Sequence, residues 1–117
     1  MVKRINDAPQ TMEDIVAPYL AIDGVVAAAL VSSEGFLVAT AGSHEFDLEA
    51  LAAHSAAVIA TTSGLANELR AGMPKTVTID LPRGNLILAP LTMDLFLLLL
   101  GDSNSVSGKI TSLSGRL

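Results

Sequence analysis

The longest uniform pattern in the chain is an uncharged stretch between Asp47 and Gly72. Residues 50–67 contain no Asp, Glu, Lys or Arg. Apolar side chains recur through it at steps of three and four, with two hydroxyls in the same row: Leu48, Leu51, Ser55, Val58, Thr62, Leu65 and Leu69. This period predicts one long helix with an apolar stripe. Asp47 is a suitable N-cap, and Gly72, with Pro74 just beyond it, is a suitable residue for the C-terminal end.

The side of this helix opposite the stripe has small residues where a surface helix would have charged ones. They are Ala50, Ala53, Ala57, Ala60, Thr61 and Gly64. Small side chains let another backbone come close, so we expect a second helix to cover this side. The chain offers no other long helix, and a second copy of the same helix is therefore the economical partner. The alternative is an ordinary Ala-rich helix, half exposed and favoured by helix propensity alone.

Five shorter segments have the patterns of strands. Val25–Ser32 and Leu95–Leu100 are apolar at nearly every position, which indicates strands covered on both faces. Phe36–Ala41 follows the first of these after a tight turn and is its predicted hairpin partner. Thr76–Leu81 alternates polar and apolar residues, as a half-buried edge strand does. Asn85–Leu91 is predicted to return beside it.

Each end of the chain has the pattern of a short helix. The first is predicted from about Met12 to Ala21, with Thr11 as N-cap and Asp14 as its capping-box partner. Pro18 lies inside this segment and removes an intrahelical hydrogen bond, so we expect the helix to be short or kinked. Residues 106–117 predict a short final helix.

The predicted order of elements is helix, two strands, long helix, three strands, short helix. Because two strands are covered on both faces, helices must lie on both sides of one antiparallel sheet. The predicted fold is thus an α/β (α+β) three-layer α/β/α sandwich with five strands. We expect the long helix on one face and the two terminal helices on the other. The 117 residues are expected to form one domain, with residues 1–10 as a loose arm.

Composition narrows the possible partners and the compartment. A net charge of −5 argues against nucleic acid as the main partner, and also against an anionic membrane surface. The chain has no cysteine, which excludes disulfides and Cys-ligated metals and fits a reducing compartment. The N-terminus does not resemble a secretory signal, and no segment is apolar and long enough to span a membrane. We therefore expect a cytoplasmic protein with no direct membrane insertion.

The sequence offers little catalytic chemistry. It has no glycine-rich nucleotide motif and no Gly-x-Ser-x-Gly elbow. His44 lies near Glu45 and Asp47, but without a spacing typical of metal ligands, so a solvated loop is the better interpretation. His54 and Ser55 are neighbours on the long helix and point about 100° apart, which is wrong for a nucleophile–base pair. No catalytic, cofactor-binding or metal-binding residue is predicted, and we do not expect an enzyme.

Two charged residues near the predicted edge strand have a simpler interpretation. Arg83 lies at a hairpin tip and could act like an arginine finger, but a solvated turn residue is the more common case. Asp80 on the edge strand discourages uncontrolled strand pairing. The remaining features, a covered helix and an edge strand, are typical of an interaction module.

Four stretches, taken in order, resemble the roadblock/dynein light chain family. They are residues 22–25 followed by AAALVSSEGFLVA, then LEALAAHSAAVIATTSGLANEL, TVTIDLPRGNLILAPL and LFLLLLGDSNSVSGKI. The resemblance covers residues 12–117 and rests on the order and spacing of the stretches. The tail departs from the family pattern: residues 105–108 read Ser-Val-Ser-Gly where the family often has Asn-Leu-Gly.

The resemblance implies a homodimer in which the strand after the long helix pairs with its own copy and the two long helices lie side by side. It implies a non-catalytic regulator or scaffold for a small Ras-like GTPase, similar to bacterial gliding-motility regulators. The expected dimer interface consists of Ala53, Ala57, Ala60, Thr61, Gly64, Thr76, Val77, Thr78, Ile79 and Asp80. The expected GTPase contacts are Glu49, His54 and Glu68.

Two other functions remain as alternatives. Related three-layer folds bind small molecules between helix and sheet, so a ligand-sensing domain is one of them. The scarcity of large aromatic side chains and buried polar anchors argues against it. A purely structural dimerisation domain is the other.

Overall fold

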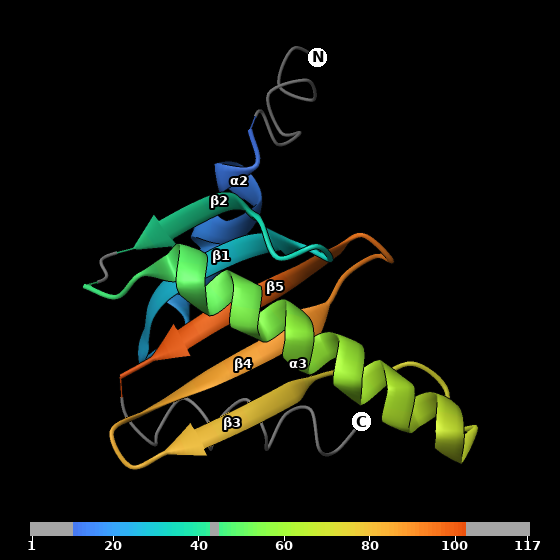
Figure 1. Cartoon of the computed structure of the whole chain (residues 1–117). Coiled ribbons are helices and arrows are strands. Elements are labelled where there is room, and N and C mark those ends of the chain that lie inside the picture. Colours follow the sequence, from blue (N-terminus) through green and yellow to red (C-terminus); the bar gives the residue numbers. More distant parts are fainter. Residues whose placement is uncertain (1–10, 43–44, 103–117) are drawn as a thin grey trace.

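The computed structural model describes residues 11–42 and 45–102 (Figure 1). Its elements are α2 (Glu13–Val16), the 3-10 helix η1 (Ala17–Ala21), β1 (Val25–Ser32), β2 (Leu37–Gly42), α3 (Leu48–Leu69), β3 (Val77–Leu81), β4 (Gly84–Pro90) and β5 (Leu95–Gly101). This order confirms the prediction from the first helix to the fifth strand, and the strand ends differ from it by at most one residue. The predicted N-terminal arm and final helix lie outside the described residues.

The described strands form one antiparallel sheet in the order β2-β1-β5-β4-β3. The two strands that the sequence predicted to be covered on both faces, β1 and β5, lie in its middle. β3 lies at one edge, as its alternating pattern predicted, and β2 lies at the other. Hydrophobic patterning therefore specified the position of a strand in the sheet as well as its existence.

Two separate cores show that helices cover both faces of the sheet. Successive residues of a strand point to opposite faces. Ala28 and Leu30 of β1 pack in one core with Val16 and with residues of η1. Ala29 of β1 packs in the other core with Ala52 of α3. α3 therefore covers one face, which it crosses diagonally in Figure 1, and α2 with η1 covers the opposite face.

The first helix is shortened as Pro18 predicted. Only Glu13–Val16 is α-helical, and the chain then tightens into η1 with the proline in its first turn, where the missing N–H has little cost. The predicted Thr11 cap is wrong. Met12 occupies the N-cap position and no side chain caps the helix. Only the reciprocal contact forms, in which the Thr11 backbone N–H donates to the Asp14 carboxylate at 3.1 Å.

The two ends of α3 differ in how well the sequence predicted them. Asp47 is the N-cap, and its Oδ1 accepts from the backbone N–H of Glu49 and Ala50 at 3.1 Å each. The residue expected at the C-terminal end was Gly72, and this is wrong. Arg70 takes the left-handed conformation (φ 54°) there, and the N–H of Ala71 closes the end on the carbonyl of Ala66.

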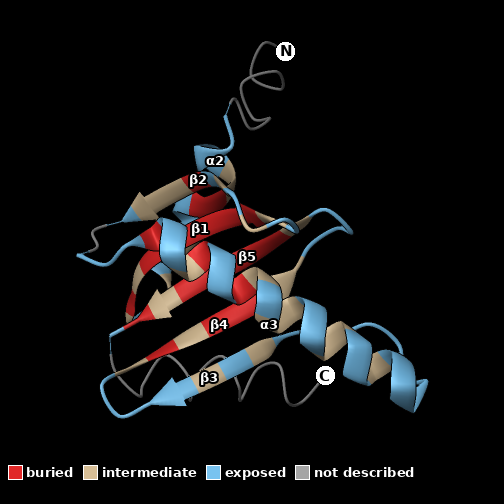
Figure 2. Cartoon of the chain, viewed as in Figure 1, coloured by how far each residue is buried: buried red, intermediate tan, exposed pale blue. Residues whose placement is uncertain are grey.

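The apolar stripe of α3 packs over only part of its length. Leu48, Ala52 and Ser55 are buried, whereas Leu65 is 60% exposed and Leu69 is 74% exposed. The stripe therefore packs on the sheet at its N-terminal end and is exposed at its C-terminal end. α3 has 22 residues and crosses the sheet obliquely, so its last turns extend beyond β3 (Figure 2).

Candidate interaction site

The small-residue face of α3 points away from the sheet. We use this name for Ala53, Ala57, Ala60, Thr61 and Gly64, all of which are exposed. A Cβ built on Gly64 would meet no atom within 4 Å. The end of the apolar stripe, with Leu65 and Leu69, is exposed as well. The described part of the protomer therefore leaves this face open, and its coverage by a second copy stays a prediction.

The edge of β3 is the second open surface. β3 pairs with β4 on one side and has no partner strand among the described residues on the other. Val77 and Ile79 are half-buried, whereas Thr78 and Asp80 are exposed. Thr76 was predicted inside this strand but lies just before it, since β3 begins at Val77. An open edge of this kind can accept another strand.

The three predicted GTPase contacts are all exposed, but α3 does not bring them together. Glu49 and Glu68 are 19 residues apart on the helix, which corresponds to about 28 Å at 1.5 Å per residue. His54 lies between them and points about 140° away from Glu49, at 100° per residue. One protomer therefore presents these side chains as separate points rather than as one cluster.

The residues considered for chemistry do not assemble into a reactive or metal site. Ser55 is buried, with 2% of its surface exposed, while His54 is exposed, so they point apart as predicted. Asp47 caps α3, and His44 lies outside the described residues. Within residues 11–42 and 45–102, no group of three His, Cys, Asp or Glu side chains could hold a metal ion. None of the helices in this part of the chain is long and apolar enough to cross a membrane.

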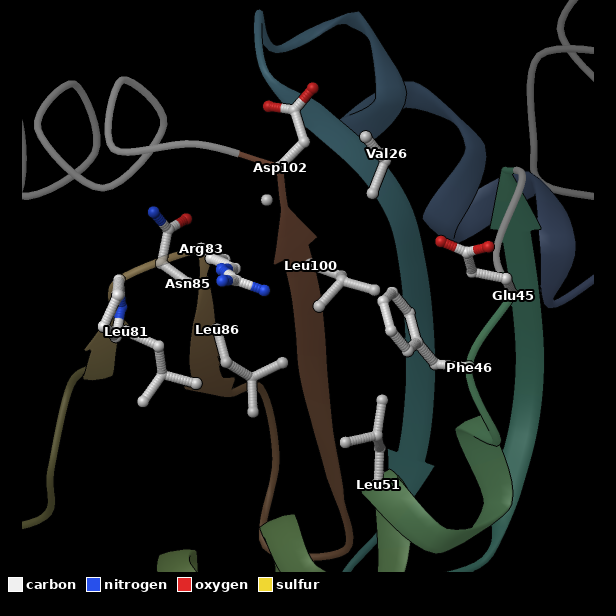
Figure 3. A pocket seen from close by; sticks show the side chains of 13 residues that line it. Val26, Glu45, Phe46, Leu51, Leu81, Arg83, Asn85, Leu86, Leu100 and Asp102 are labelled. Carbon is white, nitrogen blue, oxygen red and sulfur yellow. The ribbon is translucent and has the colours of Figure 1, made fainter.

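A groove that sequence reasoning missed lies between the start of α3 and the β3–β4 hairpin (Figure 3). Its volume is about 1090 Å³. We call it the hairpin groove and define it by Phe46, Leu51, Leu81, Arg83, Leu86 and Leu100. The alternation of β3 and β4 places Leu81 and Leu86 on the face of α3. The sequence does not say how far α3 covers that face, so it gave no signal for an open groove.

The five-stranded antiparallel sheet with helices on both faces, an open edge strand and an open helix face defines a class of small α/β domains. The chain matches the Roadblock/LC7 domain family over residues 11–101 and belongs to it, which confirms the resemblance found in the sequence. Membership in this family points to a regulatory or scaffold role rather than to catalysis. No curated protein sequence matches the chain significantly.

Several solved structures share the fold. MglB from Myxococcus xanthus superposes with a TM-score of 0.74 at 18% identity, over 88% of this chain and 81% of that one. An MglB described with a tetrameric arrangement gives 0.72 at 23% identity, over 85% and 76% of the two chains. A Roadblock/LC7 domain from Streptomyces avermitilis gives 0.72 at 12% identity, over 92% and 98%. At these identities the similarity is one of fold.

Proposed function

We propose that the protein is a homodimeric, non-catalytic regulator or scaffold that binds a small Ras-like GTPase in the cytoplasm. The observation that carries the proposal is the combination of family membership with two open surfaces. These are the edge of β3 and the small-residue face of α3, and α3 extends past that edge (Figure 1). A domain with no assembled reactive site among its described residues acts through such surfaces.

Self-association through β3 would satisfy the open edge. Each protomer contributes the five residues of β3, and each backbone hydrogen bond gained contributes about 0.5–1.5 kcal/mol net. The hydrogen bonds alone do not make a tight dimer. The small-residue face of α3 would add contact area, because side chains of this size let two helices approach to about 8 Å. The MglB described with a tetrameric arrangement gives a precedent for assembly of the fold.

The dimer would also assemble the proposed GTPase surface. In an antiparallel pair of α3 helices, centred between Ala57 and Ala60 in the middle of the small-residue face, residue 49 of one copy lies level with residue 68 of the other. Glu49 and Glu68, far apart in one protomer, would then form two equivalent acidic patches with His54 nearby. Such patches favour a partner with a basic surface.

The test is binding of purified, nucleotide-loaded small GTPases from the same organism to the wild-type chain and to the double variant Glu49→Lys, Glu68→Lys. We expect the double variant to bind the GTPase at least about tenfold more weakly. Reversing two charges at the rim of the contact should make the binding free energy less favourable by about 1.4 kcal/mol or more. Glu13→Lys reverses one exposed charge on the opposite face of the sheet and is the control for charge reversal outside the proposed surface.

The outcomes separate the competing functions. Wild-type binding that the double variant loses and Glu13→Lys retains supports the proposal. Equal affinity of all three chains would show that the GTPase contacts another surface. A dimer that binds no GTPase would favour a purely structural dimerisation domain.

A further inference from the structure

One apolar side of α3 is covered at its start and open at its end. Leu51, Val58 and Leu65 follow one another at seven-residue steps and therefore lie almost in line along the helix. Leu51 and Val58 pack against the core between α3 and the sheet. Leu65 is 60% exposed, and Leu69 in the next turn is 74% exposed. The same line of side chains is thus buried over the sheet and open where α3 passes the edge of β3 (Figure 2).

This side of α3 faces the open edge of the sheet. Leu51 lines the hairpin groove together with residues of β3 and β4 (Figure 3). On the other flank of the helix, Ala56 faces the turn between β1 and β2, where a Cβ built on Gly35 would lie 3.5 Å from the Ala56 Cβ. β2 and β3 are the opposite edges of the sheet. The exposed end of the line therefore points to the side on which a second copy would add its own β3.

The proposed homodimer brings this exposed end to the hairpin groove. Its two α3 helices are antiparallel and centred near Val58. Leu65 and Leu51 are equally far from Val58 along the chain, so Leu65 of the second copy lies level with Leu51 at the groove. By the same symmetry, Leu69 of the second copy lies level with the start of the helix, beside Phe46. The two-fold axis repeats the contact at the other end of the pair.

The groove fits the end of a helix in size and in chemistry. Two helical turns, at about 5.4 Å each and about 10–12 Å wide, occupy roughly 850–1,200 Å³, and the groove has a volume of about 1090 Å³. Phe46 is 55% exposed and Leu81 is 56% exposed, on opposite sides of a leucine floor (Figure 3). The incoming helix has no charged residue between positions 58 and 67. Covering the apolar side chains of both copies is favourable in proportion to the area removed from water.

We propose that the hairpin groove of each protomer is filled by Leu65 and Leu69 of a second copy. The first half of α3 then covers its own sheet, and its last turns cover the sheet of the other protomer. This inference rests on the homodimer proposed above and adds the groove to its interface. The contact covers four large apolar side chains of each protomer that are more than half exposed in a single chain: Phe46, Leu65, Leu69 and Leu81.

Cysteine cross-linking tests the register of the two helices, because the chain has no cysteine of its own. The double variant Leu51→Cys, Leu65→Cys should give a disulfide-linked dimer when treated with oxidised glutathione. The two positions are 14 residues apart on one helix, about 21 Å at 1.5 Å per residue, so their disulfide can form only between two copies.

The matched control for cross-linking is the double variant Leu51→Cys, Asn67→Cys. Its second thiol lies at the same end of α3 but points about 160° away from position 65, at 100° per residue, and it should not cross-link. A dimer in which the Leu51→Cys, Leu65→Cys variant forms no more disulfide than this control would overturn the proposal.

Substitutions on both sides of the contact test its contribution to the dimer. Leu65→Glu and Leu69→Glu should each raise the dissociation constant at least about tenfold in analytical ultracentrifugation, because a charge enters an apolar contact. Phe46→Ser on the groove side should also weaken the dimer through lost apolar contact. Asn67→Glu adds the same charge to the opposite flank of the helix and should leave the dissociation constant unchanged. Circular dichroism establishes that each variant is folded.

The outcomes distinguish failure of this contact from failure of the proposed function. A monomeric wild-type chain would refute the homodimer, and the groove contact with it. A wild-type dimer that persists unchanged in Leu65→Glu, Leu69→Glu and Phe46→Ser would refute the groove contact alone. If Phe46→Ser kept the dimer but lost GTPase binding, the GTPase would be the occupant of the groove and the proposal would be wrong.

Discussion

At the scale of single residues, the close packing of η1, β1 and β2 depends on Gly42. The backbone angle φ of Gly42 is +98°, a conformation that residues other than glycine rarely adopt. A Cβ there would lie 2.5 Å from the Val26 carbonyl oxygen and 2.9 Å from Leu20 Cδ2. Both contacts are too short, and one is with backbone that cannot move aside cheaply. Position 42 therefore requires glycine for two reasons: its backbone conformation, and the lack of room for a Cβ atom.

We predict that Gly42→Ala lowers the free energy of unfolding by about 3 kcal/mol, of which about 1 kcal/mol is the left-handed penalty and the rest is overpacking. Gly72→Ala is the matched control. Gly72 also has a positive φ, of 90°, but an added Cβ meets no atom within 4 Å, so only the conformational penalty applies. Urea unfolding of both variants checks this. Equal destabilisation by the two substitutions would show that the contacts around Gly42 relax.

Residue-scale prediction worked where the chemistry is local. Asp47 was identified as the N-cap because its side chain can reach the N–H groups two and three residues on, and it does so. The C-terminal end was assigned to Gly72 because glycine is the usual left-handed residue. The chain instead turns at Arg70, where the path from helix to β3 requires it. That path is set by tertiary packing, which the local sequence does not encode.

At the scale of elements, the C-terminal end of α3 has backbone strain at Arg70 that a glycine would relieve. Arg70 has φ 54° and ψ 38°, and this conformation costs a residue with a Cβ about 1 kcal/mol relative to glycine. We predict that Arg70→Gly raises the free energy of unfolding by about 0.5–1 kcal/mol. Arg70→Ala keeps the Cβ and should leave the stability nearly unchanged. Urea midpoints measure both, and a Gly variant no more stable than the Ala variant would contradict the strain.

The elements also show why the groove and the free end of α3 escaped sequence reasoning. A helical stripe predicts which side of a helix is apolar, but the width of the sheet decides how much of the stripe is buried. Leu65 and Leu69 continue the pattern of Leu48, yet they extend past β3 and are exposed. The same oblique crossing leaves Leu81 uncovered at the other end of β3. The groove and the exposed end of α3 both depend on the angle at which α3 crosses the sheet, and this angle is set by side-chain packing between the two.

At the scale of the whole molecule, the fold followed from the sequence because two strands are apolar on both faces. β1 and β5 could lie only in the middle of a sheet with helices on each side, and the order of the remaining elements then leaves few arrangements. The interaction site is less determined. Glu49 and Glu68 lie at the two ends of α3 in one protomer and would meet only in the proposed dimer, so the structure of one chain does not determine their role.

The central prediction at this scale is a homodimer built from the edge of β3 and the small-residue face of α3. We expect a wild-type mass of about twice the 12.1 kDa of one chain in light scattering after gel filtration at micromolar concentration. Gly64→Arg should raise the dissociation constant at least about 30-fold, because an unpaired charge buried in the contact costs above ~2 kcal/mol. Thr78→Pro should also weaken the dimer if the Thr78 N–H faces the partner strand.

Ala21→Arg introduces the same side chain at an exposed position in η1, on the opposite face of the sheet, and should leave the dimer intact. Circular dichroism establishes that each variant is folded before its mass is interpreted. A wild-type mass near 12.1 kDa would exclude the dimer altogether. A folded Gly64→Arg variant that remains a dimer would show that the helix face is not in the contact. The edge of β3 would then be the surface to test alone, since its open hydrogen-bonding groups would still require a partner.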